Sequence, residues 1–206
     1  MKYKKTNVFK SFFVAHMNLY LFLLSLFAIG LITGIVHSAV LGDEAKSESY
    51  TYITTFISAL KTKKFDINIL FNEFLVTNLK SGIFLWLFGL WIIGIPLICG
   101  YIAFEGYSVG FVISIVLNSL GTGKGSFLLC LALLPQELFI IPVLLTLGVN
   151  SILFAKAVWR TKNRISSIKF DIYRYIFLFI LCIAVLICVT VMQTYIQVPV
   201  IKNVLT

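Results

Sequence analysis

Apolar residues are concentrated in long runs along this chain, and polar residues gather between the runs. A helix that crosses the hydrocarbon core of a bilayer needs about 20 mostly apolar residues. The runs predict five such helices, at residues 19–41, 82–104, 107–120, 126–148 and 173–192. The third run is short enough for a re-entrant or interfacial segment to compete with a full span. The predicted fold is therefore an all-α, polytopic transmembrane bundle, a single membrane domain over residues 1–206.

The composition supports a membrane setting. Hydrophobic residues make up 60% of the chain and charged residues 12%, with a mean hydropathy of +1.00. A soluble domain is typically about 45–50% apolar and about 25% charged. The net charge of +9 comes from basic clusters beside apolar runs, which is typical of topology determinants and not of a nucleic-acid-binding face. We therefore expect the lipid bilayer as a partner and no nucleic acid.

Two basic clusters predict the orientation, because short cytoplasmic loops carry an excess of Lys and Arg. One cluster precedes the first span, and the other begins in the loop at 156–172. Five spans place both clusters on the cytoplasmic side, whereas four would place them on opposite sides. We therefore expect a cytoplasmic amino terminus and an extracytoplasmic carboxy terminus, with the first run kept as an uncleaved span. The clusters are Lys2, Lys4, Lys5 and Lys10, then Lys156, Arg160, Lys162, Arg164, Lys169 and Arg174.

The loop at 42–81 is then extracytoplasmic, and its positive and negative charges nearly balance. Part of it has the spacing of an amphipathic helix, which Asp66 can cap. We expect this helix to lie on the outer interface or to pack on the bundle, with Glu73 largely on its other side. The loop is too small for an independent enzyme domain but offers room for a docking surface. The apolar side of the helix is Ile67, Leu70, Phe71, Phe74 and Leu75.

A polar break interrupts the fourth run at Pro135, Gln136, Glu137 and Pro142. A charged side chain at the centre of a spanning helix costs roughly 2.5–3.5 kcal/mol on insertion scales, so this segment should face protein or a polar cavity. One interpretation is a structural polar node that fixes the shape of the bundle. The alternative is an intramembrane site of a small transporter or channel subunit, because discontinuous helices often line substrate sites.

Two further ionisable groups lie near the apolar runs. Glu105 is expected at the cytoplasmic end of the second span, as an interfacial charge. His37 lies in the first span, where a lone His is more often a packing residue. Pairing of His37 with Glu137 is conceivable, but nothing in the sequence places the two together.

Two pairs of glycines have the spacing of a helix-packing motif. Gly30 and Gly34 lie in the first span, and Gly106 and Gly110 lie at the third. Small residues four apart let helix backbones approach closely. The motif predicts packing on another helix. That helix can belong to this chain or to a second copy of it in an oligomer.

Residue sets for catalysis, metal binding or cofactor binding are not evident in the sequence. The four cysteines lie within apolar runs and form no CxxC pair, which favours small buried hydrophobes. The glycine-rich segment 121–126 lacks the spacing of a phosphate-binding loop and is better interpreted as a tight hairpin. We therefore expect no enzymatic activity, no cofactor and no metal, and a membrane-embedded enzyme is the least favoured class.

Three segments resemble the stage II sporulation protein M family. They are LWLFGLWIIGIPL at 85–97, FEGYSVGFV at 104–112, and the segment 126–148 with its Leu-Pro-Gln followed by Ile-Pro. The likeness in length, span number and lysine-rich amino terminus covers roughly residues 8–195.

The resemblance implies a function that composition does not. Such proteins are scaffolds in the mother-cell membrane at the sporulation septum of endospore-forming bacteria. They recruit two peptidoglycan hydrolases, stage II sporulation proteins D and P, for engulfment of the forespore, and have no enzymatic activity assigned. Contacts with these hydrolases are expected at the 42–81 loop, the 121–125 hairpin or lateral helix faces.

Overall fold

The computed structural model describes residues 14–61, 67–160 and 165–205. Within these ranges the chain is helical and contains no strand, so the all-α prediction is confirmed. The amino-terminal lysines, the cap Asp66, and Lys162 and Arg164 of the basic loop lie outside the described residues. In chain order the elements are α2 Met17–Val40, α3 Asp43–Lys61, α4 Ile67–Phe88, α5 Gly94–Ala132, α6 Leu134–Arg160, α7 Ile165–Met192, the π-helix η1 Gln193–Gln197 and α8 Val198–Leu205.

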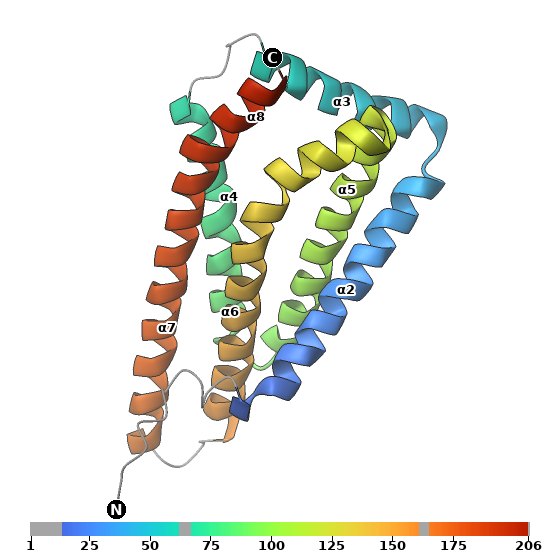
Figure 1. Ribbon diagram of the computed structural model, residues 1–206. Helices are drawn as coiled ribbons and strands as arrows, with labels where there is room; N and C mark the ends of the chain where they lie inside the picture. Colours follow the sequence, from blue (N-terminus) through green and yellow to red (C-terminus); the bar gives the residue numbers. More distant parts are fainter. Residues whose placement is uncertain (1–13, 62–66, 161–164, 206) are drawn as a thin grey trace, which may run out of the picture.

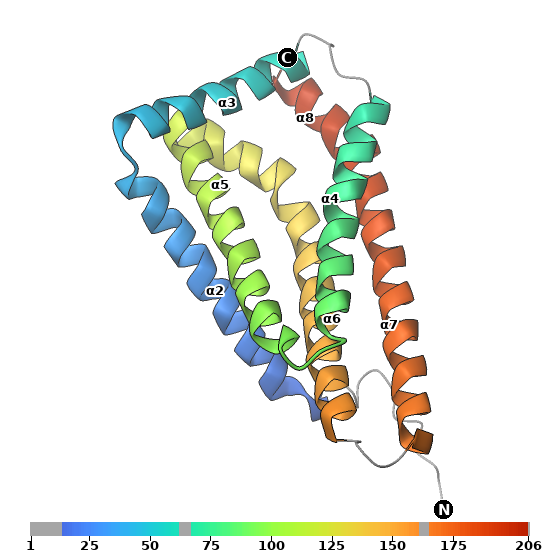
Figure 2. The same cartoon turned by 180° about the vertical axis from the view of Figure 1, so that it is seen from behind.

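The helices α2, α4, α5, α6 and α7 run along the bundle, and α3 lies across one of its ends (Figures 1 and 2). We call that end the α3 end. The opposite end, where α2 begins and where α6 connects to α7, is called the basic end. Successive long helices alternate in direction, so α2 begins at the same end of the bundle at which α6 ends and α7 begins.

Four helical stretches of the described chain are long and apolar enough to cross a membrane. They are Met17–Val40, Gly94–Ala132, Leu134–Arg160 and Asp171–Ile201. Helix α4 is more polar but lies beside them (Figure 2). Its 22 residues, at about 1.5 Å each, give a length of roughly 33 Å, which matches the hydrocarbon core. The parity that the basic clusters predict requires α4 to cross as well, and α4 is not among the four apolar stretches.

The second predicted span, 82–104, differs from the structure. Its first residues end α4, its last begin α5, and a turn at residues 89–93 separates them. A Cβ on Gly89 would lie 2.7 Å from the Ser151 Cβ, so the close packing of this turn on α6 requires glycine. Pro96 follows in the first turn of α5, where a missing N–H is tolerated. The predicted third span, 107–120, is consequently the later part of one crossing helix.

The predicted helix in the outer loop is also part of a longer element. Residues 67–75 begin α4, which continues without interruption to Phe88. Buried Leu70, Gly82 and Leu85 hold α4 against the rest of the bundle. Packing on the bundle, one of the two arrangements expected from the sequence, is therefore what the structure shows.

The chain reverses within α5 at Gly121, whose φ of +77° and ψ of 161° are non-helical. Glycine adopts this conformation readily and other residues do so rarely. The following segment returns towards α6, so a hairpin stands where the sequence predicts one (Figure 1). The predicted fourth span, 126–148, is divided at Leu133 between this returning segment and α6, which extends on to Arg160.

Helices α2 and α5 pack through their two glycine pairs. Gly30 of α2 lies against Ala103 of α5, and Gly106 of α5 lies against Phe27 of α2. One turn further on, Gly34 and Gly110 make the equivalent contacts, and all four glycines are buried. The two motifs therefore meet each other within one chain.

Candidate functional site

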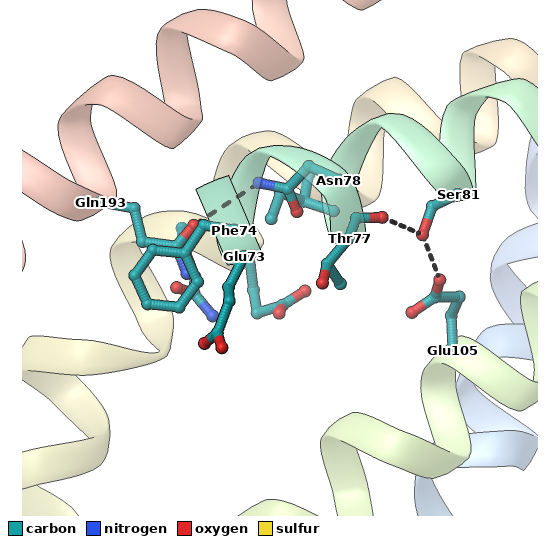
Figure 3. Close-up of a pocket in the computed structure, with 10 residues that line it drawn as sticks. Glu73, Phe74, Thr77, Asn78, Ser81, Glu105 and Gln193 are labelled. Carbon is teal, nitrogen blue, oxygen red and sulfur yellow. Dashed lines mark hydrogen bonds between the residues drawn. The ribbon is translucent and has the colours of Figure 1, made fainter. Parts of the chain in front are cut away.

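A polar cavity of about 370 Å³ lies between α4, α5, α6 and the π-helix η1 (Figure 3). Eight of its ten lining residues are polar, although the surrounding helices are mostly apolar. The lining residues are Glu73, Phe74, Thr77, Asn78, Ser81, Glu105, Gln136, Glu137, Ile140 and Gln193.

Three carboxylates line this cavity, each from a different helix. Glu73 belongs to the second turn of α4, Glu105 to the middle of the first segment of α5, and Glu137 to the first turn of α6. Glu73 is exposed, whereas Glu105 and Glu137 are half-buried. None of the residues that line the cavity is basic. The lining of the cavity is therefore acidic.

A chain of hydroxyl groups positions Glu105. The Tyr101 hydroxyl donates to Ser81 Oγ over 2.8 Å. Ser81 Oγ in turn donates to Glu105 Oε1 over 3.0 Å (Figure 3). This arrangement corrects the prediction that Glu105 is an interfacial loop charge. The reason is the turn at 89–93, which moves the boundary of the span and leaves Glu105 deep within α5.

Amide groups close another side of the cavity and link α4 to α7. Asn78 Nδ2 donates to Thr190 Oγ1 over 3.0 Å and reaches Gln193 Oε1 at 3.5 Å. Gln193 is the first residue of η1, and one-turn π-helices of this kind are frequent at functional sites. Gln193, which begins the π-helix at the end of the apolar helix α7, thereby lines the cavity.

The predicted polar node begins α6. Gln136 and Glu137 line the cavity, and the dipole at this helix N-terminus favours negative charge. Pro135 lies in the same first turn, where proline is tolerated. Pro142 lies inside α6, and its carbonyl accepts a 2.8 Å hydrogen bond from Thr146 Oγ1. Gln136 and Glu137 therefore line the cavity, whereas Pro142 lies in the interior of α6.

His37 lies elsewhere and does not contact Glu137. Its Nδ1 forms a hydrogen bond with the Tyr107 hydroxyl, and its ring stacks on the Tyr107 ring with centroids 5.8 Å apart. His37 is therefore a packing residue between α2 and α5, near the α3 end of the bundle.

The described residues contain no group of three His, Cys, Asp or Glu side chains that could hold a metal ion. The four cysteines are free thiols in the structure, at Cys99, Cys130, Cys182 and Cys188.

The sequence does not predict that α4 contributes to the cavity. Glu73, Thr77 and Ser81 repeat every four residues and so lie on one side of α4. From the sequence, Glu73 is expected on the other side of the predicted amphipathic helix, and no side is assigned to Thr77 or Ser81. A polar stripe on a helix long enough to cross a membrane is the signal that could have placed it against a cavity.

Comparison with known families shows which family the chain belongs to. The family model described as stage II sporulation protein M matches residues 21–196. The chain belongs to the stage II sporulation protein M family. The matched region contains every residue that lines the cavity. Membership indicates a role in sporulation, and the apolar helices agree with a membrane location. No curated protein matched the chain, and no solved structure matched it.

Proposed function

We propose that this stage II sporulation M-family chain is a scaffold at the sporulation septum. It recruits and localises two peptidoglycan hydrolases, stage II sporulation proteins D and P, for engulfment of the forespore. In this proposal the chain lies in the mother-cell membrane and performs no catalysis itself, because the two hydrolases supply it. The observation that carries the proposal is α3, which lies across one end of the bundle (Figure 1) and has several exposed polar residues.

Helix α3 has the properties of a docking surface. Glu48, Thr51, Tyr52 and Thr55 are exposed and share one side of the helix, since they are three or four residues apart. Tyr52 is 81% exposed, and tyrosine is enriched among the residues that dominate binding energy at interfaces. Lys46 Nζ donates a 3.1 Å hydrogen bond to the Ala39 carbonyl, which ties the start of α3 to α2.

Charge distribution supports placing α3 on the extracytoplasmic side, where peptidoglycan lies. Four basic residues precede residue 17 and six lie at 156–174, against Asp171 as the single acidic residue. Residues 42–66, which contain α3, carry four basic and four acidic residues. The positive-inside rule therefore favours a cytoplasmic basic end and an amino terminus inside.

The test is co-purification from sporulating cells with Tyr52→Ala and a matched control, Tyr173→Ala. Both tyrosines are highly exposed, 81% and 75%, but they lie near opposite ends of the bundle. We expect Tyr52→Ala to reduce recovery of the hydrolases about tenfold, the factor that a loss of 1.4 kcal/mol produces. Equal recovery with both variants would exclude this side of α3 as the docking surface for the hydrolases. Absence of both hydrolases from the wild-type preparation would refute the scaffold function.

A small transporter or channel subunit is a second candidate, favoured by the three carboxylates around one cavity. Intramembrane ionisable residues often mark ion or proton pathways. Its test is Na⁺, K⁺ and H⁺ flux in proteoliposomes with wild-type chain and with Glu137→Gln. Flux that Glu137→Gln abolishes would support this candidate, and wild-type vesicles as tight as protein-free vesicles would remove it.

A further inference from the structure

The basic end of the bundle gathers cationic side chains from separate helices. Three of the four candidate membrane spans, in α2, α6 and α7, reach this end. Lys156 and Arg160 lie in the last turns of α6, are exposed, and share one side of the helix because they are four residues apart. Arg174 lies near the start of the span in α7, and His16 immediately precedes α2. Asp171 is the one acidic side chain that the described residues place at this end, so the end is positively charged at the boundary of the spans.

Contacts between the helices bring these groups together. The rings of Phe154 and Tyr175 stack with their centroids 4.1 Å apart. This contact holds the part of α6 just before Lys156 beside the part of α7 that carries Arg174. Burial lowers the pKa of His16, and the Arg174 guanidinium lowers it further, so these two groups are close enough to interact. Positive charge from segments that are distant in the chain is therefore concentrated in one region.

Aromatic residues mark the same end independently of its charge. The chain has three tryptophans, which are Trp86 near the end of α4, Trp91 in the turn before α5, and Trp159 next to the end of α6. Helices α4 and α6 end at the basic end, and α5 begins there (Figure 2). Trp91 is 69% exposed and Trp159 is 65% exposed. Since tryptophan is enriched at the level of the lipid head groups, the exposed rings place the basic end at that level.

The surface beside the cations fits a lipid better than a soluble anion. Tyr173, Phe177 and Ile180 are exposed and lie three or four residues apart, on one side of α7. This mostly apolar side begins next to Arg174 and leads away from the basic end along the candidate span. A phospholipid has the same order of parts, a phosphate group followed by acyl chains. A free phosphate ion would use the cations and leave the apolar side without a role.

We propose that the basic end binds the head groups of anionic phospholipids such as phosphatidylglycerol. The phosphate oxygens accept hydrogen bonds from Lys156, Arg160 and Arg174, and the acyl chains lie along the exposed side of α7. Charge-assisted hydrogen bonds of this kind are stronger than neutral ones, and basic residues at the ends of spans attract acidic lipids. The inference goes beyond the proposed scaffold function and does not depend on it, because the ligand is a lipid and not a recruited protein.

The test measures lipid contact through the tryptophans, which lie at this end. The full chain is placed in phosphatidylcholine vesicles that contain increasing fractions of dibrominated phosphatidylglycerol or dibrominated phosphatidylcholine. Bromine on an acyl chain quenches a tryptophan that it contacts, so the two quenching curves give the relative association of the two lipids. We expect phosphatidylglycerol to associate at least about fivefold more tightly, the factor that one Lys or Arg near the membrane surface contributes.

The decisive variant is Lys156→Gln with Arg160→Gln, which removes two exposed cations from the basic end. We expect the preference for phosphatidylglycerol to fall at least about fivefold. The matched control is Lys80→Gln with Lys124→Gln, which removes the same charge from two exposed lysines outside the basic end and should leave the preference unchanged. Circular dichroism checks that each variant is helical. If the double variant does not fold, Arg160→Gln alone replaces it, with a loss of preference again expected.

Several results would overturn the proposal. Equal association of the two lipids with the wild-type chain would do so, and so would an unchanged preference in the variant at the basic end. An equal loss in the control variant would make the net charge of the chain, and not this site, the cause. Protection of the chain in neutral detergent against thermal unfolding by inorganic phosphate, and not by NaCl of the same ionic strength, would assign the cations to a soluble phosphate instead.

Discussion

Replacing Gly106 with alanine tests whether the α2–α5 interface stabilises the bundle through direct backbone contact. A Cβ at this position would lie 2.9 Å from the Phe27 carbonyl carbon, and closer to its oxygen. Ordinary contact begins at 3.4 Å, so the backbone of α2 would have to retreat by at least 0.5 Å. Backbone cannot rotate away as a flexible side chain can. We expect the free energy of unfolding to fall by about 1–3 kcal/mol, the usual cost of overpacking.

Gly100 is the matched control, because it lies in the same helix and has no atom within 4 Å of the position of an added Cβ. Alanine is about 0.8–1.0 kcal/mol better than glycine inside a helix. Gly100→Ala should therefore leave stability unchanged or raise it. The two variants differ in position alone, so their difference reports the interface and not helix propensity.

The assay is unfolding of the purified chain in mixed micelles by added SDS, followed by circular dichroism. Equal midpoints for Gly106→Ala and Gly100→Ala would refute the reasoning, because contact distances would then not determine the cost. The double variant Gly30→Ala with Gly106→Ala extends the test. We expect its loss to be smaller than the two single losses combined, because one separation of α2 from α5 relieves both clashes.

Three further substitutions probe other parts of the bundle by the same unfolding assay. Tyr175→Phe removes the hydroxyl that donates to the Trp86 carbonyl and should cost about 1 kcal/mol; an unchanged midpoint would show that the bond adds nothing. Gly121→Ala should cost about 1–3 kcal/mol because its positive φ is strained for alanine, whereas Gly123→Ala, which has open space and no positive φ, should be neutral; equal losses would contradict this. Asn78→Leu should cost about 0.6 kcal/mol, the mean for interhelical hydrogen bonds in membranes, and a gain in stability would refute a bracing role between α4 and α7.

The boundaries of the central helices show why hydropathy alone misplaced a span. Residues 82–104 form one apolar run, and an average over such a run does not register a turn whose residues are themselves apolar. The sequence signals of this turn are Gly89, Gly94 and the nearby Pro96. Glycine, however, is also common in spanning helices. The packing of Gly89 on α6 distinguishes a turn from a helix here. That contact is not visible from local sequence.

The sequence predicts only part of the cavity lining, and the turn at 89–93 that hydropathy does not register is one cause. Glu137 stands out because it interrupts an apolar run beside two prolines, so the sequence marks it as polar and buried. Glu73 lies 64 residues away in a more polar segment, and Glu105 was placed at the wrong depth once the turn was missed. Helices that are distant in the chain bring these groups to one cavity.

By itself the sequence determined the all-α membrane class, the clustering of basic residues and the family, since each follows from composition, local periodicity or short motifs. It also marked both glycine pairs as packing positions. Tertiary structure alone decided that these pairs meet each other, that α4 lies beside the apolar helices, and that three carboxylates line one cavity. The physical reason is that apolar runs fix which residues avoid water but not their neighbours. Close packing of backbones and the pairing of buried polar groups select those neighbours.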